Sequence, residues 1–312
     1  MKIKKYILLF AFLAFSVMLF SSCGAHESKS DKISVITTLF PQYDFAKTIA
    51  QDKADIKLLL KPGVDSHSYE PTSSDMIEIS NADLFIYTGN SMETWAKTVL
   101  DSVDSSTLKT VDVSNGINLV TVAEEHRENA AHDEHDSIYD PHIWTDPQNA
   151  KIIVKNISDA LCAADEKNAG FYRQNAENLL NELDKLDSDF EAFFSSCENK
   201  TIVFGSRFAM YYFAKRYGLN CIAAFDTCSG EGEASPGKIA ELCEIIKKNN
   251  LKAVYYEELS DPGVANTIAA ETNTKALLLH SCHNVSESDF NSGKGYISLM
   301  RQNLENLKQG MN

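Results

Sequence analysis

The sequence lacks three short motifs that would indicate thiol redox chemistry, nucleotide binding or zinc-dependent hydrolysis. It has no Cys-x-x-Cys pair, no glycine-rich phosphate loop and no His-Glu-x-x-His segment of the kind found in zinc hydrolases. Basic residues are also few: 29 lysines and arginines stand against 44 aspartates and glutamates, for a net charge of −15. Nucleic-acid-binding proteins are basic, so this acidic excess argues against a nucleic-acid partner and is compatible with attracting cations.

Long apolar runs are absent except near the N-terminus. Three lysines precede an uncharged apolar run from Tyr6 to Phe20, and small residues then lead to Cys23. The run is short for a membrane-spanning helix, and this order of segments is typical of a secretory signal. Because the cysteine directly follows small residues, the segment resembles a bacterial lipoprotein signal. We therefore predict a signal peptide over residues 1–22, lipidation of Cys23, and a polar tether over 23–31. The mature chain, with a charge of −18, would be extracytoplasmic and anchored by lipid to the bacterial cell membrane.

Strand-like and helix-like segments alternate twice along the remaining chain. Strands are predicted at 32–37, 55–60, 82–88 and 109–113, and again at 201–204, 221–225, 252–257 and 275–280. Helices are predicted at 41–50, 74–80, 91–103, 146–163, 208–217, 237–249, 262–272 and 289–310. Such alternation indicates parallel sheets that helices cover on both faces.

A long periodic segment separates the two alternating regions. Between Asn168 and Phe194, apolar residues recur at steps of three and four, which predicts one helix of roughly 40 Å. The sequence therefore predicts an α/β fold with two parallel-sheet lobes, 32–165 and 198–312, joined by one long rigid helix at 166–197.

Histidines are placed where such lobes bind ligands. His67 follows the second predicted strand, and His142 lies in a turn between Pro141 and Pro147. His280 ends the last predicted strand, directly before Cys282 and His283. Parallel sheets bind ligands beyond the carboxyl ends of their strands, and imidazole is a preferred ligand of zinc. We expect a metal cleft between the lobes.

The segment Glu124–Asp136 carries three further histidines among carboxylates: His126, His132 and His135. It is either an accessory collector of metal or a solvated acidic loop.

Three motifs resemble the metal-binding lipoproteins of ABC importers for zinc and manganese. They are His67-Ser-Tyr-Glu-Pro-Thr-Ser-Ser-Asp75, Pro141-His-Ile-Trp-Thr-Asp-Pro147 and Tyr212-Phe-Ala-Lys-Arg-Tyr-Gly-Leu219. The resemblance implies two lobes bridged by a rigid helix, with no catalysis. It also implies Zn²⁺ (alternatively Mn²⁺) as cargo, a permease and its ATPase as partners, and a monomeric chain. It makes His67 and His142 ligands and places His280 where the family has an acidic ligand. The acidic histidine loop resembles an insertion of the zinc-specific branch.

One position departs from this family pattern. The family's third ligand, a histidine or glutamate, aligns with Arg207, which has no lone pair for a metal. Water, Cys282, His283 or Glu257 are the candidates to replace it. We expect His280 to be a ligand from the second lobe, Cys282 or His283 to lie within reach of the metal, and Glu257 to pair with Arg207. Three imidazoles favour zinc over manganese.

The six cysteines after Cys23 are even in number but do not have the spacing of a small disulfide scaffold. Cys228 and Cys282 are expected at one edge of the second lobe, where a disulfide, free thiols or a Cys282 ligand are all open. Two other functions also remain open from the sequence. A surface adhesin is one, and a zinc hydrolase, which would need a general base beside an open metal position, is the other.

Overall fold

The computed structural model describes residues 31–103, 108–121, 139–225 and 234–311. Several predictions fall outside these ranges: the signal peptide, Cys23, nearly all of the tether, the acidic histidine loop and Cys228. The described residues from Lys32 onward belong to one compact unit.

The first sheet contains four parallel strands in the order β2-β1-β3-β4. They are β1 (Ile33–Thr37), β2 (Ala54–Leu58), β3 (Leu84–Tyr87) and β4 (Lys109–Asp112). The crossovers carry α2 (Phe40–Ala50), α3 (Ser73–Ser80) and α4 (Ala96–Ser102), and α5 (Pro147–Ala164) follows the sheet. The strands β1 and β3 are central and largely buried, as expected of a sheet covered on both faces.

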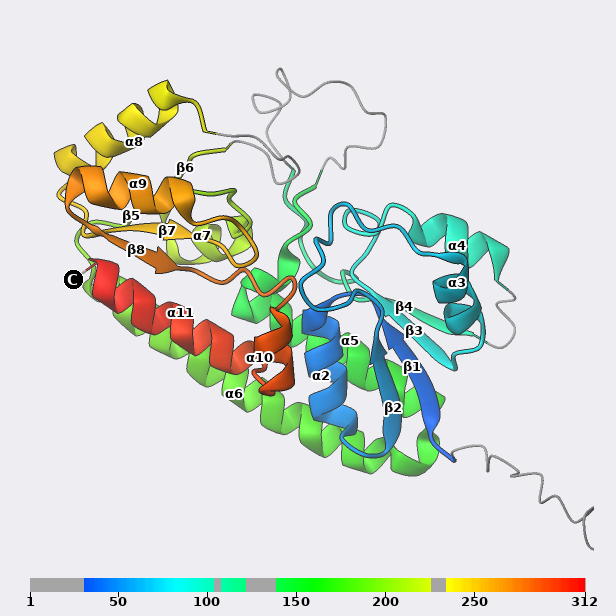
Figure 1. The fold of residues 1–312 in the computed structure, drawn as a ribbon. Coiled ribbons are helices and arrows are strands. Elements are labelled where there is room, and N and C mark those ends of the chain that lie inside the picture. Colours follow the sequence, from blue (N-terminus) through cyan, green and yellow to red (C-terminus); the bar gives the residue numbers. More distant parts are fainter. Residues whose placement is uncertain (1–30, 104–107, 122–138, 226–233, 312) are drawn as a thin grey trace, which may run out of the picture. The chain divides into compact units, whose positions relative to one another are not determined.

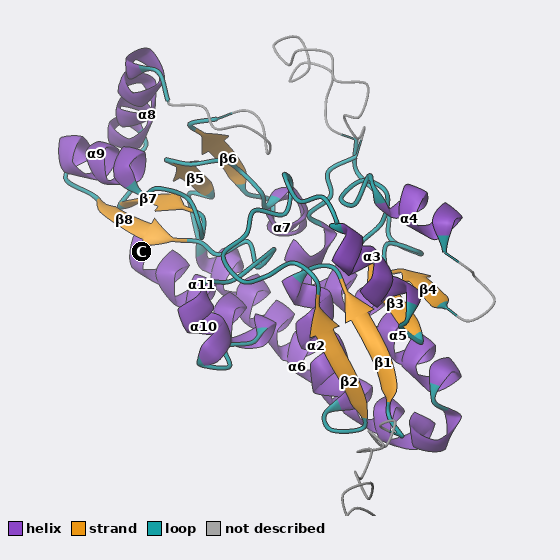
Figure 2. Cartoon of the chain, turned by 45° about the vertical axis from the view of Figure 1, so that its right-hand side comes forward, coloured by secondary structure: helices purple, strands orange, loops and turns teal. Residues whose placement is uncertain are grey.

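The second sheet repeats this arrangement, with parallel strands in the order β6-β5-β7-β8 (Figure 2). They are β5 (Thr201–Phe204), β6 (Asn220–Ala223), β7 (Ala253–Tyr256) and β8 (Lys275–Leu278). Its helices are α7 (Tyr211–Tyr217), α8 (Pro236–Lys248), α9 (Gly263–Thr272), α10 (Glu287–Asn291) and α11 (Tyr296–Met311). The predicted fold class, two parallel-sheet lobes, is confirmed.

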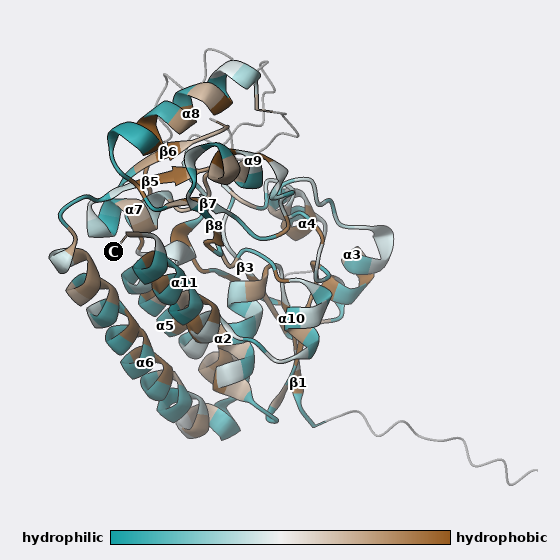
Figure 3. Ribbon diagram, turned by 60° about the vertical axis from the view of Figure 1, so that its left-hand side comes forward, coloured by the Kyte–Doolittle hydropathy of each residue, from teal (hydrophilic) through white to brown (hydrophobic). Residues whose placement is uncertain are grey.

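One long helix, α6 (Ala169–Ser196, 28 residues), connects the two sheets and runs beneath both in Figure 1. Its length is about 42 Å at 1.5 Å per residue. Apolar residues buried along one stripe include Leu183, Leu186 and Phe190, while its other face is polar (Figure 3). None of the helices in the described ranges is both long and apolar enough to cross a membrane.

The lobes share packing through this helix. A single hydrophobic cluster extends from Val35 in β1 through α6 to Leu279 beyond β8. Asp187 on α6 adds a polar link, because its carboxylate accepts hydrogen bonds from Gln148 of α5 (2.7 Å) and from Arg216 of α7 (2.6 Å). The two sheets, whose strand ends precede the candidate ligands, are therefore packed on the same helix, α6.

The predicted single helix over 289–310 is wrong, because the chain breaks between α10 and α11. Gly293 has a φ of +73°, which side-chain-bearing residues rarely adopt. Gly295 lies against the half-buried carboxylate of Asp44, and a Cβ there would be 2.7 Å from Asp44 Oδ1. Asp44 Oδ2 accepts a hydrogen bond from the Tyr296 amide (2.8 Å) and so begins α11. Helix α4 also begins at Ala96, five residues later than predicted.

Candidate metal centre

The first candidate ligand, His67, is held by its own loop between β2 and α3. Asp65 Oδ1 accepts hydrogen bonds from the amides of His67 (2.8 Å) and Ser68 (3.3 Å), which fixes the backbone around the imidazole. A reciprocal cap between Thr72 and Asp75 then begins α3. The motif residues around His67 thus shape a rigid turn.

The second, His142, precedes a short 3₁₀ turn, η2 (Ile143–Thr145), and is fully buried. Asp140 Oδ1 lies 2.9 Å from the His142 amide and 3.1 Å from its ring Nδ1. Trp144 in the same turn donates its indole N–H to the Ser281 carbonyl at 2.8 Å. That bond joins the His142 turn of the first lobe to the loop after β8 of the second.

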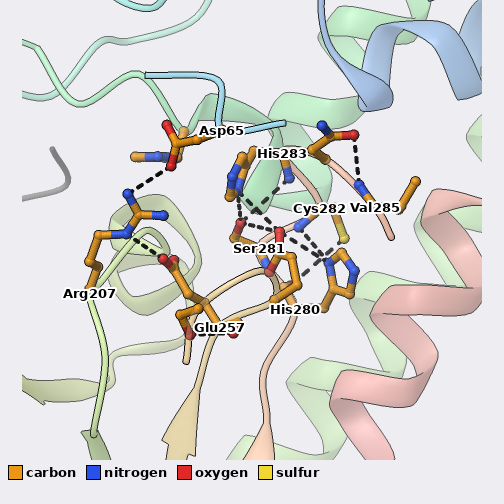
Figure 4. A network of polar contacts seen from close by, with 12 residues as sticks. Asp65, Arg207, Glu257, His280, Ser281, Cys282, His283 and Val285 are labelled. Atoms are coloured by element: carbon orange, nitrogen blue, oxygen red, sulfur yellow. Dashed lines mark hydrogen bonds and ion pairs between the residues drawn. The ribbon is translucent and has the colours of Figure 1, made fainter. Parts of the chain in front are cut away.

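The loop after β8 contributes His283, whose ring is 1% exposed. Its Nδ1 lies 3.1 Å from Glu258 Oε1 and 2.6 Å from Ser281 Oγ (Figure 4). Glu258 in turn accepts from the Ser281 amide at 2.6 Å. The His283 Nε2 atom has no hydrogen-bond partner among the described residues. A buried ring nitrogen left without a partner is a candidate for a metal bond.

These three imidazoles meet at one place. The Nε2 atoms of His67 and His142 are 3.3 Å apart, and their ring centroids 5.2 Å. A tetrahedral zinc with Zn–N near 2.0–2.1 Å would place two such nitrogens about 3.3–3.4 Å apart and the centroids about 5.2 Å apart. The His67 and His283 centroids are 6.1 Å apart. His283 therefore has to approach by roughly 1 Å for the same tetrahedral geometry.

This gap agrees with a second observation. The described ranges contain no group of three or more His, Cys, Asp or Glu side chains already arranged to hold an ion. The Nε2 atoms of His67 and His142 already have the spacing of two ligands of a tetrahedral ion. The ring of the third histidine, His283, is still too far from His67 for that geometry.

Carboxylates behind the rings orient them. The carboxylate of Asp140 contacts Nδ1 of His142, and that of Glu258 contacts Nδ1 of His283. Nε2 is then the ring nitrogen of each histidine whose lone pair can bind a metal. Burial and the neighbouring His142 ring lower the pKa of His67 to about 3, so His67 is neutral at physiological pH. Burial alone would lower the pKa of His283, but Glu258 outweighs it and raises that pKa.

His280 and Cys282 have other surroundings. The His280 Nδ1 accepts a hydrogen bond from the Cys282 amide at 2.9 Å. The Asn303 side chain accepts a hydrogen bond from the His280 amide and donates one to the His280 carbonyl. None of the contacts among the described residues joins the His280 ring to His67 or His142. Cys282 is a free thiol in the hydrophobic core, and burial raises its pKa well above the ordinary value. The structure thus brings His67, His142 and His283 together. The His280 ring lies beside the Cys282 amide and Glu258, and its Nε2, like that of His283, has no hydrogen-bond partner among the described residues.

Arg207 lies at the same edge, in the loop after β5. Its Nε donates to Glu257 Oε1 at 2.6 Å and its Nη1 to Asp65 Oδ2 at 3.1 Å. The predicted pairing of Arg207 with Glu257 is confirmed. Burial, followed by the charge of Glu258, raises the pKa of Glu257. Arg207 connects the His67 loop of one lobe to the end of β7 in the other.

Two similar parallel-sheet lobes on one long helix, with buried imidazoles meeting between their carboxyl edges, define a two-lobed solute-binding protein. The chain belongs to the family described as "Zinc-uptake complex component A periplasmic", whose model matches residues 35–310.

Named relatives agree with this family. The high-affinity zinc uptake system protein ZnuA of Bacillus subtilis is 34% identical over 293 residues, which covers 93% of this chain and 91% of the relative. The zinc-binding lipoprotein AdcA of Streptococcus pneumoniae is 33% identical over 98% of this chain, but the match spans only 61% of AdcA.

Solved structures agree as well. The Zn(II)-bound ZnuA-like domain of AdcA aligns with a TM-score of 0.76 at 32% identity, covering 90% of this chain and 99% of the domain. The laminin-binding protein Lmb of Streptococcus agalactiae, described as having adhesin and metal-transporting activity, aligns at 29% identity with a TM-score of 0.75. That match covers 90% of this chain and all of Lmb.

Proposed function

We propose that this chain is an extracytoplasmic lipoprotein that captures Zn²⁺ and delivers it to the permease of an ABC importer. The observation that carries the proposal is the meeting of His67, His142 and His283, with two Nε2 atoms at zinc spacing and a third without a partner. Three imidazoles select zinc over manganese, which prefers oxygen ligands. The family and the named zinc-uptake relatives support the same cargo.

His283, rather than His280 or Cys282, is the ligand from the second lobe in this proposal. Its Nδ1 is fixed by Glu258 in the same way as that of His142 is fixed by Asp140. The His280 Nδ1 accepts a backbone amide of its own loop at 2.9 Å and lies farther from the same carboxylate, 3.4 Å from Glu258 Oε1.

The site binds and does not catalyse in this proposal. The carboxylates nearest to His142 and His283 stand behind the rings on Nδ1, where they orient ligands and are not available as a general base for metal-bound water. Lipidation at Cys23 would keep the protein at the membrane surface beside the permease and its ATPase, and one chain would suffice for one ion.

Elemental analysis of the purified protein and zinc titration of a matched pair of variants test the proposal. His283→Asn and His280→Asn each keep a polar group near the Nδ1 position and lose Nε2. We expect one zinc per wild-type chain and at least tenfold weaker binding for His67→Ala, His142→Ala and His283→Asn, since even the loss of an outer partner costs that much. His280→Asn should stay near wild type. The opposite result for the pair would return the ligand role to His280.

Adhesion is a second candidate function, favoured by the similarity to Lmb along 90% of this chain. Immobilised laminin, probed with the zinc-loaded and the zinc-free protein, tests it directly. Saturable binding would support adhesion alongside zinc capture, and its absence would leave zinc capture alone.

A further inference from the structure

The second oxygen of Glu257 is an unexplained feature of the metal centre. Glu257 directly follows β7 and is 2% exposed. Its Oε1 is bound by Arg207, whereas its Oε2 is buried and has no hydrogen-bond partner among the described residues. A buried carboxylate oxygen without a donor is costly unless a cation or a proton satisfies it.

The surroundings of this oxygen point to a cation. Glu257 is next in sequence to Glu258, whose carboxylate contacts the Nδ1 of His283, and Arg207 ties Glu257 to Asp65 on the His67 loop. Figure 4 shows Asp65, Arg207, Glu257 and His283 in the same network of polar contacts. Three unpartnered ligand-type atoms, Oε2 of Glu257 and the Nε2 atoms of His280 and His283, are thus buried in this network.

Three imidazoles leave one position of a tetrahedral zinc open, and structural zinc sites close that position with a fourth protein ligand. We propose that Glu257 Oε2 is this fourth ligand, and that Arg207 holds the carboxylate in place through Oε1. The inference rests on the proposed zinc-binding function. Arg207 has no lone pair, so at this site it acts as a positioning residue for Glu257, which directly follows β7.

This arrangement has a chemical consequence for the cargo. A carboxylate adds one negative charge to three neutral imidazoles, so the filled site carries a net charge of +1 next to the Arg207 cation. A water in the same position would leave +2, with more repulsion from Arg207. Glu257 therefore lowers the electrostatic cost of holding a dication beside an arginine.

The test compares zinc affinity of the full mature chain and of Glu257→Gln, measured by competition with a zinc chelator. Glu191→Gln is the matched control, because Glu191 also pairs with an arginine, Arg216, but is 57% exposed on α6. We expect at least tenfold weaker binding for Glu257→Gln and no change for Glu191→Gln. A crystal structure of the zinc-loaded wild type should place Oε2 about 2.0–2.2 Å from the metal.

Glu257→Asp provides a second arm if Glu257→Gln does not fold. It keeps the charge but withdraws the carboxylate by one methylene, and the same tenfold loss is expected. Wild-type affinity in either folded variant, with water as the fourth ligand in the crystal, would overturn the role of Glu257 and leave zinc capture intact. A wild-type protein that binds no zinc would overturn the proposed function and this inference with it.

Discussion

Asp140 offers a sharp test of the idea that carboxylates behind the imidazoles set the metal affinity. Its Oδ1 serves both the amide and the ring Nδ1 of His142 at 2.9 and 3.1 Å. Asp140→Asn keeps the size of the side chain and one carbonyl oxygen in place, so the turn can still close. What is lost is the negative charge that stabilises the imidazole once a metal withdraws electron density from it.

The magnitude follows from the difference between two kinds of hydrogen bond. A bond to a charged group contributes about 1.5–3 kcal/mol and a neutral one about 0.5–1.5 kcal/mol. The difference of about 1–1.5 kcal/mol corresponds to roughly a tenfold weaker zinc affinity. Asp140→Ala, which leaves both donors of His142 without an acceptor in a buried site, should approach a hundredfold loss.

Competition with a chromogenic zinc chelator at fixed pH and ionic strength measures both variants. The control is Asp52→Asn, which removes the same charge from a side chain that is 74% exposed. If Asp140→Asn binds zinc as tightly as Asp52→Asn does, the orienting charge contributes nothing and the reasoning fails. An equal loss in both variants would instead attribute the effect to the net charge of the chain.

Two further predictions concern stability without metal. Burial raises the pKa of Glu93 from 4.5 to about 7. The folded state therefore holds more protons than the unfolded state, and this group lowers the unfolding free energy, by up to about 3 kcal/mol, as the pH rises from 4.5 to 7. Relative to wild type, Glu93→Gln should gain stability between pH 5 and 8 in urea unfolding, and a flat difference would contradict the assignment. Gly295→Ala should cost about 1–3 kcal/mol, because its Cβ would displace Asp44. Gly170 is on helix α6, and a Cβ there would have no atom within 4 Å, so Gly170→Ala should raise the unfolding free energy by about 0.5–1 kcal/mol in the same assay. Equal effects of the two substitutions would show that the room for a Cβ does not decide their effect on stability.

The fold could be predicted closely because its signals are local. Strand β5 has the predicted bounds, and α6 differs from its prediction by one residue at the start and two at the end, since helical and strand periodicity are properties of short windows. The break between α10 and α11 was missed for a non-local reason. Gly295 is needed there because Asp44, about 250 residues earlier in the chain, occupies the space.

The histidines of the candidate site also differ in whether local or distant residues orient them. His67 and His142 lie in turns that nearby residues stabilise. Asp65 and Asp140, each two residues before the histidine, accept a hydrogen bond from its backbone amide. His283 is different, because its orienting carboxylate, Glu258, comes from the loop of a neighbouring strand.

The sequence predicts His280 as a second-lobe ligand, with Cys282 or His283 within reach of the metal, because the last strand is expected to end at His280. In the structure β8 ends at Leu278, two residues earlier. The chain then turns through Cys282 in a left-handed conformation, with a φ of +65°. Neither the early end of β8 nor this turn has a signal in the sequence, since a cysteine rarely adopts a positive φ.

The strand order explains how the site can tolerate an arginine at position 207. In each sheet the chain leaves its first strand to one side and returns on the other, so the loops after β5 and β7 are neighbours at the point where the order reverses. Arg207 and Glu257 occupy those two loops and contact each other. In the proposed site, the loop after β7 therefore supplies a ligand, Glu257, directly beside Arg207 in the loop after β5. The sheet preserves the place where a metal can bind, while the residue type in each loop decides which side chain reaches it.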